Sequence, residues 1–148
     1  MFRKILVAVS LVAALAGAAT TACGDDATVP PSYFEGTWTG AWPSYLDASS
    51  TQDITIAIRR GGKEGVFIVE YEWAPMSFRS RTVPGGKVKA KGTPEGDTFA
   101  FGWENREGRE MKITLRKQAE DSVKARIDRG GPLRPGERPY SEATLKRK

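Results

Sequence analysis

Carboxylates, lysines and a single cysteine are the side chains in this sequence whose spacing suggests chemistry. Glu70 and Glu72 lie two positions apart, which in a strand puts both on one solvent-exposed face. Glycosidases instead need two carboxylates facing each other across a cleft. The sequence has no histidine, the usual proton-transfer residue near neutral pH and the commonest metal ligand. It also has no Gly-x-Ser-x-Gly motif, phosphate-binding loop or dinucleotide fingerprint. We therefore expect a protein that is not an enzyme and that uses no metal or cofactor.

Basic side chains are unevenly distributed along the chain. The formal net charge is +5, yet 23–108 contains 9 basic and 12 acidic residues, whereas 109–148 contains 12 basic and 6 acidic ones. Lys87, Lys89 and Lys91 form an alternating basic row. A solvated strand face is one interpretation of this row. Docking to an anionic surface, such as lipid head groups or an acidic polysaccharide, is the other.

The only cysteine, Cys23, directly follows a typical export signal. Arg3 and Lys4 make a short basic start, 5–19 is an unbroken run of 15 apolar or small residues, and small residues follow it. These are the three parts of a secretory signal peptide. The run is shorter than the roughly 20 apolar residues that span a membrane. We expect residues 1–22 to be removed on export.

The end of this signal resembles a bacterial lipobox, in which small residues precede the cysteine that receives the lipid. Thr21 and Ala22 fit the pattern, whereas Thr20 replaces the usual leucine. The resemblance implies lipidation of Cys23 and membrane anchoring by more than one acyl chain. Because Gly24 rather than aspartate follows, it also implies the outer membrane in a diderm bacterium, and otherwise the cell surface or periplasm. Cleavage after Ala22 without lipidation is the alternative.

The remaining sequence divides into a tether and one domain. Residues 23–32 contain two adjacent prolines and no periodicity, and they predict a flexible tether. From Tyr33 onward apolar residues alternate, and glycine- and proline-rich turns recur every 8–12 residues or so. The pattern predicts an all-β domain at 33–148, a small antiparallel up-and-down β-barrel of about eight strands. The first strand is expected at 33–42, and 76–83 is left either as a paired segment or as a flap over the barrel mouth.

The same alternation points aromatic side chains into the barrel. These are Trp38, Trp42, Phe67, Tyr71, Trp73, Phe99, Phe101 and Trp103. One interpretation is plain core packing. The other is an apolar pocket open at one mouth of the barrel. In that case Tyr71, Trp73 and Trp42 are the expected ligand-binding residues, because each combines an aromatic ring with a polar group.

Gly36-Thr37-Trp38 is similar to the Gly-x-Trp motif that opens the first strand of lipocalins and other calycins. In that superfamily an arginine from the last strand packs across the tryptophan and closes the barrel. Arg147 has the parity to do so here, so the resemblance implies closure by Trp38 and Arg147. The middle motif of lipocalins and their usual helix after the barrel are missing, so the resemblance is to a calycin-like barrel on a bacterial lipoprotein.

The sequence therefore predicts a lipid-anchored protein of the cell envelope whose barrel binds a small apolar or amphipathic ligand without catalysis. The alternative is a filled barrel that acts through its outer surface as an interaction or inhibitor module, with an envelope protein or an anionic surface as partner. Nucleic acid is not an expected partner of an exported protein.

Overall fold

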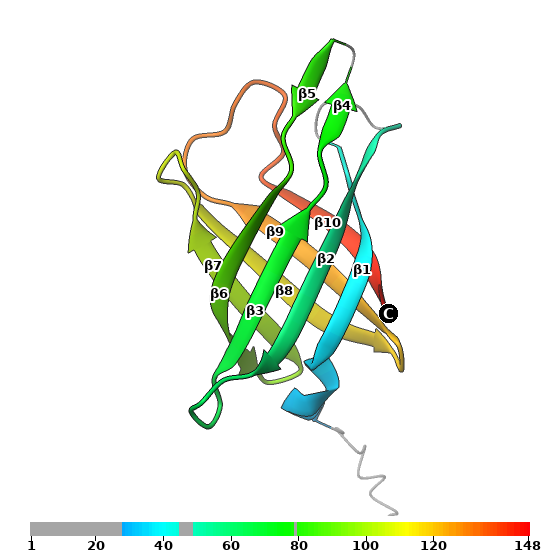
Figure 1. The fold of residues 1–148 in the computed structure, drawn as a ribbon, viewed down its shortest axis with the longest axis vertical. Coiled ribbons are helices and arrows are strands. Elements are labelled where there is room, and N and C mark those ends of the chain that lie inside the picture. The colour runs from blue at the N-terminus through cyan, green and yellow to red at the C-terminus, as the bar shows by residue number, and fades with distance from the viewer. Residues whose placement is uncertain (1–27, 45–48, 79) are drawn as a thin grey trace, which may run out of the picture.

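Eight antiparallel strands close into a barrel in the order β1-β10-β9-β8-β7-β6-β3-β2 (Figure 1). This computed structural model describes residues 28–44, 49–78 and 80–148. The predicted all-β class and the antiparallel up-and-down barrel of about eight strands are confirmed. The expected signal peptide (1–22), Cys23 and the tether as far as residue 27 lie outside the described residues.

The elements follow one another along the chain as a meander. They are η1 (Pro31–Phe34), β1 (Gly36–Pro43), β2 (Thr51–Arg60), β3 (Phe67–Trp73), β4 (Met76–Phe78), β5 (Arg81–Val83), β6 (Gly86–Glu95), β7 (Thr98–Glu104), β8 (Glu110–Ala119), β9 (Ser122–Arg129) and β10 (Tyr140–Arg147). The end of the barrel beside η1 is called the closed end below. The opposite end, where β1 ends, β2 begins and the connections 105–109 and 130–139 lie, is called the mouth.

The closed end is plugged by the 3-10 turn η1. The prediction that a strand begins at Tyr33 is wrong, because Pro31–Phe34 form this turn. Pro31 at its start has the fixed φ that a helical turn requires. The turn places Phe34 inside the barrel, fully buried, with its ring centroid 5.6 Å from that of Phe99. No helix in the described part of the chain is long and apolar enough to cross a membrane.

The half of the barrel next to the closed end is filled by its own side chains. The largest fully buried side chains come from seven strands and η1, namely Phe34, Trp38, Ile56, Val69, Phe99, Ile113, Leu115, Val123 and Leu145. Gly92 makes room for the Phe99 ring of β7, since a Cβ at this position would lie 2.3 Å from that ring. Such a core leaves the mouth as the place where the barrel can receive anything else.

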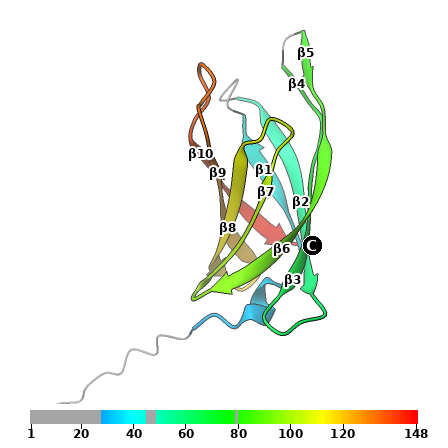
Figure 2. The same cartoon turned by 90° about the vertical axis from the view of Figure 1, so that its left-hand side faces the viewer.

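The segment 76–83 forms the hairpin β4–β5, which extends β3 and β6 beyond the mouth (Figures 1 and 2). Its base is attached to β2, because Ala74 N–H donates to the Asp53 carbonyl (2.9 Å) and Gln52 Nε2 donates to the Ala74 carbonyl (3.0 Å). Pro75 and Pro84 mark the positions where the two arms leave the barrel sheet. The segment therefore forms a two-stranded sheet of its own and is not part of the barrel sheet.

Candidate binding site at the barrel mouth

Two pairs of neighbouring strands, β6 with β7 and β1 with β10, are hydrogen-bonded over only part of their length. All four strands are fully described. β6 has ten residues, but only Gly92–Glu95 pair with β7. From their shared turn the two strands diverge toward the mouth (Figure 2). β1 and β10 pair through Trp38 with Arg147 and Thr39 with Lys146. The barrel wall is thus hydrogen-bonded at the closed end and split between β6 and β7 toward the mouth.

Aromatic side chains close the inner side of this split. The Tyr71 ring lies 5.2 Å from Trp73 and 5.2 Å from Trp103, and Trp103 stacks on Phe101 at 6.1 Å, centroid to centroid. The Trp73 ring rests on Gly86 of β6, where a Cβ would lie 2.3 Å from the ring. Trp73 and Trp103 remain half-buried, so apolar rings that point into the barrel still meet solvent at the mouth.

The Tyr71 hydroxyl lies at the centre of this cluster and is only partly satisfied. Trp42 Nε1 donates to it at 2.9 Å, and both residues are 3% exposed. Among the described residues no group accepts the hydroxyl proton. Burial raises the pKa of Tyr71 to about 12, against the opposing effects of the Trp42 hydrogen bond and the positive charge of Arg129. The hydroxyl is therefore a neutral, buried donor that lacks an acceptor.

Charged side chains form the opposite side of the mouth. Arg109 Nη1 lies 3.0 Å from Glu137 Oε2, and Arg109 Nε donates to the Gly130 carbonyl (2.9 Å). Arg129 Nη2 donates to Ser141 Oγ (3.0 Å). The Arg109, Arg129 and Glu137 side chains are only 11%, 9% and 7% exposed. Buried ion pairing thus fixes the connection 130–139 to the ends of β8 and β9.

The electrostatics of Glu137 follow from these contacts. Burial by itself would raise the pKa of this carboxyl. Hydrogen bonds from the Arg134 backbone N–H (3.0 Å) and from Arg109, with the charges of Arg109 and Arg129, outweigh it and hold the pKa below its usual range. Glu137 is therefore ionised at neutral pH and serves as a structural counter-ion.

Two hollows lie at the rim of the mouth. One, of about 470 Å³, separates the ends of β1 and β10 and is lined by Pro43, Ser44 and residues 138–142. The other, of about 610 Å³, separates the connection 105–109 from residues 130–134 and is lined by both glutamates and arginines. Neither hollow is lined by Tyr71, Trp73 or Trp103.

The structure separates the residues expected from the sequence into two groups. Trp42, Tyr71 and Trp73 lie together near the mouth, with Trp42 and Tyr71 buried and bonded to each other. Trp38 and Arg147 lie at the closed end, with the Arg147 guanidinium carbon 4.3 Å from the Trp38 ring centroid. Cys23 lies outside the described residues.

At the closed end Arg147 also binds the backbone that carries η1. Its Nη1 donates to the Glu35 carbonyl (2.5 Å) and its Nη2 to the Tyr33 carbonyl (2.7 Å). Trp38 Nε1 donates to the Phe34 carbonyl (2.9 Å). These bonds join the last strand, the first strand and η1, so this group stabilises the barrel and is separate from the mouth.

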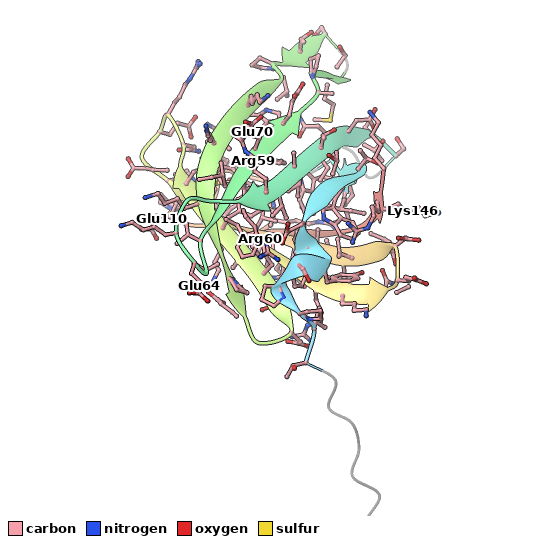
Figure 3. The ribbon with its side chains drawn as sticks, turned by 60° about the horizontal axis from the view of Figure 1, so that its bottom comes forward. Arg59, Arg60, Glu64, Glu70, Glu110 and Lys146 are labelled. Carbon is pink, nitrogen blue, oxygen red and sulfur yellow. The ribbon has the colours of Figure 1, made fainter. Side chains whose placement is uncertain are left out.

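The outer face of β2, β3 and β6 has the charges that the sequence indicates. Glu70 and Glu72 both face solvent, and Glu70 pairs with Arg59 (3.3 Å) and Lys87 (3.2 Å), as Figure 3 shows for Arg59 and Glu70. Lys87 Nζ also lies 4.0 Å from Glu72. The two carboxylates do not face each other across a cleft, and in the described residues no group of three or more potential ligands could hold a metal ion.

Several residues of the mouth were not identified as site residues from the sequence. The alternation placed Trp103 inside the barrel, but nothing in it showed that the ring would reach Tyr71 across β6. Arg129 comes two positions after the buried Ile127 in the same strand, so the alternation predicts that its side chain points inward. The pairing of Arg109 with Glu137 depends on how 130–139 folds back, for which the sequence has no signal.

A scan against protein-family models and searches of curated proteins and of solved structures found no match to this chain. The geometry of the mouth is therefore the basis for any statement about function.

Proposed function

We propose that this protein is an exported, lipid-anchored protein of the cell envelope whose barrel binds a small amphipathic ligand at the mouth, without catalysis. The observation that carries the ligand proposal is the buried Tyr71 hydroxyl, whose proton has no acceptor among the described residues. An unsatisfied buried donor costs about 1–3 kcal/mol. A ligand that supplies the acceptor removes this cost.

The surroundings of Tyr71 indicate the chemistry of the ligand. The half-buried rings of Trp73 and Trp103 lie beside the Tyr71 ring, and Met111 contributes a further half-buried apolar side chain near the mouth. Flat apolar groups stack well on such rings. Because the other half of the barrel is filled, the ligand would sit shallowly. We expect a flat, largely apolar molecule with a carbonyl, ether or similar acceptor at one end.

The anchor is supported by the sequence alone. The predicted signal at 1–22 ends at the only cysteine, and the described chain begins at the closed end, opposite the mouth (Figure 1). Attachment through Cys23 would therefore leave the mouth accessible.

Native mass spectrometry of the exported Cys23→Ser variant, purified from an envelope extract without detergent, tests the ligand proposal. We expect a bound molecule of defined mass. Tyr71→Phe, which removes only the hydroxyl, should lower the occupied fraction about fivefold or more, the equivalent of one hydrogen bond. Tyr33→Phe is the matched control, because it removes a hydroxyl that donates to the Ser122 carbonyl (2.8 Å) at the closed end. A bare mass for the parent protein, or equal occupancy in the two tyrosine variants, would argue against the proposal.

A further inference from the structure

The edge of β6 that faces β7 carries unpaired backbone groups. Glu95 and Thr98 flank a two-residue turn in which Gly96 has φ +62°, so they form a hydrogen-bonded pair. In an antiparallel strand the N–H and C=O groups of every second residue point to the same neighbour. The backbone groups of Lys91, Lys89 and Lys87 therefore point toward β7, as those of Glu95 do.

Of these groups β7 meets only the Lys91 carbonyl, because Gly92 and Phe101 form a non-hydrogen-bonded pair that is flanked by bonds on both sides. Its ladder with β6 ends at the pair Gly92 and Phe101, and both strands are fully described. On its other side β6 pairs with β3 from Phe67–Gly92 to Trp73–Gly86. Residues 86–90 thus form an open strand edge on the side of β6 that faces β7. Gly102, the next outward-facing position on β7, has no side chain that would cover it.

The charge along this edge is positive. Lys87 pairs with Glu70 and Glu72 of β3. Lys89 and Lys91 are exposed, and neither forms an ion pair with any described residue. Lysines that line an open edge for three alternate positions favour an added strand whose outward side chains are acidic. The inward positions of the same edge are small or apolar, namely Gly86, Val88 and Ala90.

We infer that the open edge of β6 binds an extended acidic segment of another protein by strand addition. The segment's backbone would bond to the free groups of Lys87 and Lys89 and to the free N–H of Lys91. Its acidic side chains would face Lys89 and Lys91 on the outside, and its alternate apolar side chains would face Val88 and Trp103 on the inside. Main-chain bonds of this kind provide affinity, and the alternating side chains provide specificity. This inference goes beyond the ligand proposal, because it depends on the strand edge and not on Tyr71.

Lysines on an open edge have a second known use, which is to prevent strands of two copies from pairing. The two roles make opposite predictions for an acidic peptide. A binding edge should bind it, whereas lysines that only keep the edges of two copies apart should not. The experiment below therefore measures peptide binding and self-association together.

The probe is a synthetic seven-residue peptide of alternating valine and glutamate, with a valine–lysine peptide as its control. Binding to the exported Cys23→Ser protein is measured by fluorescence anisotropy. We expect saturable binding of the glutamate peptide alone. Lys89→Ala should weaken it about two- to fivefold, as for one cross-strand ion pair. Lys124→Ala is the matched control on β9, which pairs on both sides, and it should leave binding unchanged.

Lys89→Pro separates the backbone from the charge. The amide that proline removes faces the open edge and not β3, so the barrel should be retained. The loss of both charge and amide should weaken binding roughly tenfold or more. Hydrogen exchange of the parent protein needs no variant, and the glutamate peptide should slow exchange of the Lys87, Lys89 and Lys91 amides but not of the Lys124 amide.

Either of two results would overturn the inference. The first is that the glutamate peptide protects none of the three edge amides. The second is that it fails to bind while Lys89→Ala or Lys91→Ala causes the protein to self-associate in sedimentation, which would assign these lysines to edge protection. Loss of ligand mass in Tyr71→Phe with intact peptide binding would leave this inference standing, so the two proposals can fail separately.

Discussion

At the scale of single residues, Tyr71 shows how one hydroxyl separates two interpretations of an aromatic cluster. A phenylalanine would pack against Trp73 and Trp103 equally well. The hydroxyl instead accepts a bond from Trp42 and holds its own proton where no described group accepts it. Packing explains the ring, and the bond from Trp42 Nε1 uses the hydroxyl as an acceptor but leaves its proton without a described partner.

Burial of Tyr71 predicts a loss of stability in alkali. The pKa of this residue is about 12 in the folded protein and near 10 when it is exposed. Its contribution of about 3 kcal/mol is therefore complete below pH ~10 and lost as the pH rises toward ~12. Urea unfolding near pH 9 and near pH 12 should show a smaller loss for Tyr71→Phe than for the parent protein. Identical losses would show that the hydroxyl is not buried in the neutral form.

A second prediction concerns the contribution of Arg147 to stability at the closed end. Arg147→Ala removes two hydrogen bonds to backbone carbonyls and a cation–π contact with Trp38. We expect a loss of roughly 2–4 kcal/mol in the free energy of unfolding. The neighbouring Lys146→Ala, an exposed change on the same strand, should stay within about 0.5 kcal/mol. Similar effects of the two substitutions in urea unfolding would contradict the closing role of Arg147.

At the scale of elements, the connection 130–139 is held by a buried ion pair rather than by regular structure. Arg109 and Glu137 are almost fully covered, and one Arg109 nitrogen, Nη2, is buried without a hydrogen-bond partner among the described residues. Removing one member of a buried pair leaves the other uncompensated. The Glu137 carboxylate therefore adds to the backbone bonds at the ends of the connection, which run from Arg129 N–H to the Pro139 carbonyl (2.8 Å) and from Gly130 N–H to the Glu110 carbonyl (2.7 Å).

Glu137→Gln should release this connection. We expect a loss of roughly 3 kcal/mol and faster hydrogen exchange at 130–138. Because the pKa of Glu137 is lowered, its contribution exists above the usual carboxyl range and disappears as the pH falls through its folded value. Acid should therefore loosen 130–138 in the parent protein but not in the variant. Glu107→Gln, which removes an exposed partner of Arg134, is the control and should change little.

The elements also show what the sequence could and could not predict. Alternation in runs such as Ile54, Ile56 and Ile58 predicted the strands and their inward faces, because one face of each strand is buried. It could not show that Tyr33 belongs to a 3-10 turn, since proline at the turn's start is equally compatible with an extended chain. Nor could it show where pairing stops on β6, because Lys87, Lys89 and Lys91 alternate regularly whether or not a neighbour is present.

At the scale of the whole molecule, the two ends of the barrel differ in character. The closed end holds η1 and the start of the described chain (Figure 1), together with the Trp38–Arg147 contact. The mouth holds the open side of β6, the half-buried aromatic rings and the buried arginines. An anchor that precedes residue 28 would therefore attach to the end that has no site.

Cys23→Ser tests that anchor directly. If Cys23 is lipidated, the parent protein should stay in the membrane fraction after extraction with alkaline carbonate, because two or more acyl chains hold a protein there stably. The variant should be recovered as soluble exported protein. Equal recovery of both from the soluble fraction would favour ordinary cleavage after Ala22.

The short seam between β1 and β10 has a consequence for how the chain can be reconnected. Both strands reach the closed end, where Lys148 N–H donates to the Thr37 carbonyl (2.9 Å). A short flexible linker from Lys148 to the residues before η1 should therefore produce a circular permutant, opened between Gly62 and Lys63 where a side chain would meet nothing within 4 Å of Gly62. The linker would connect β10 covalently to β1, and these are the neighbouring barrel strands with the fewest paired residues. We expect this permutant to fold with the far-ultraviolet circular dichroism of the parent. That result would show that the barrel forms wherever along its sequence the chain begins and ends.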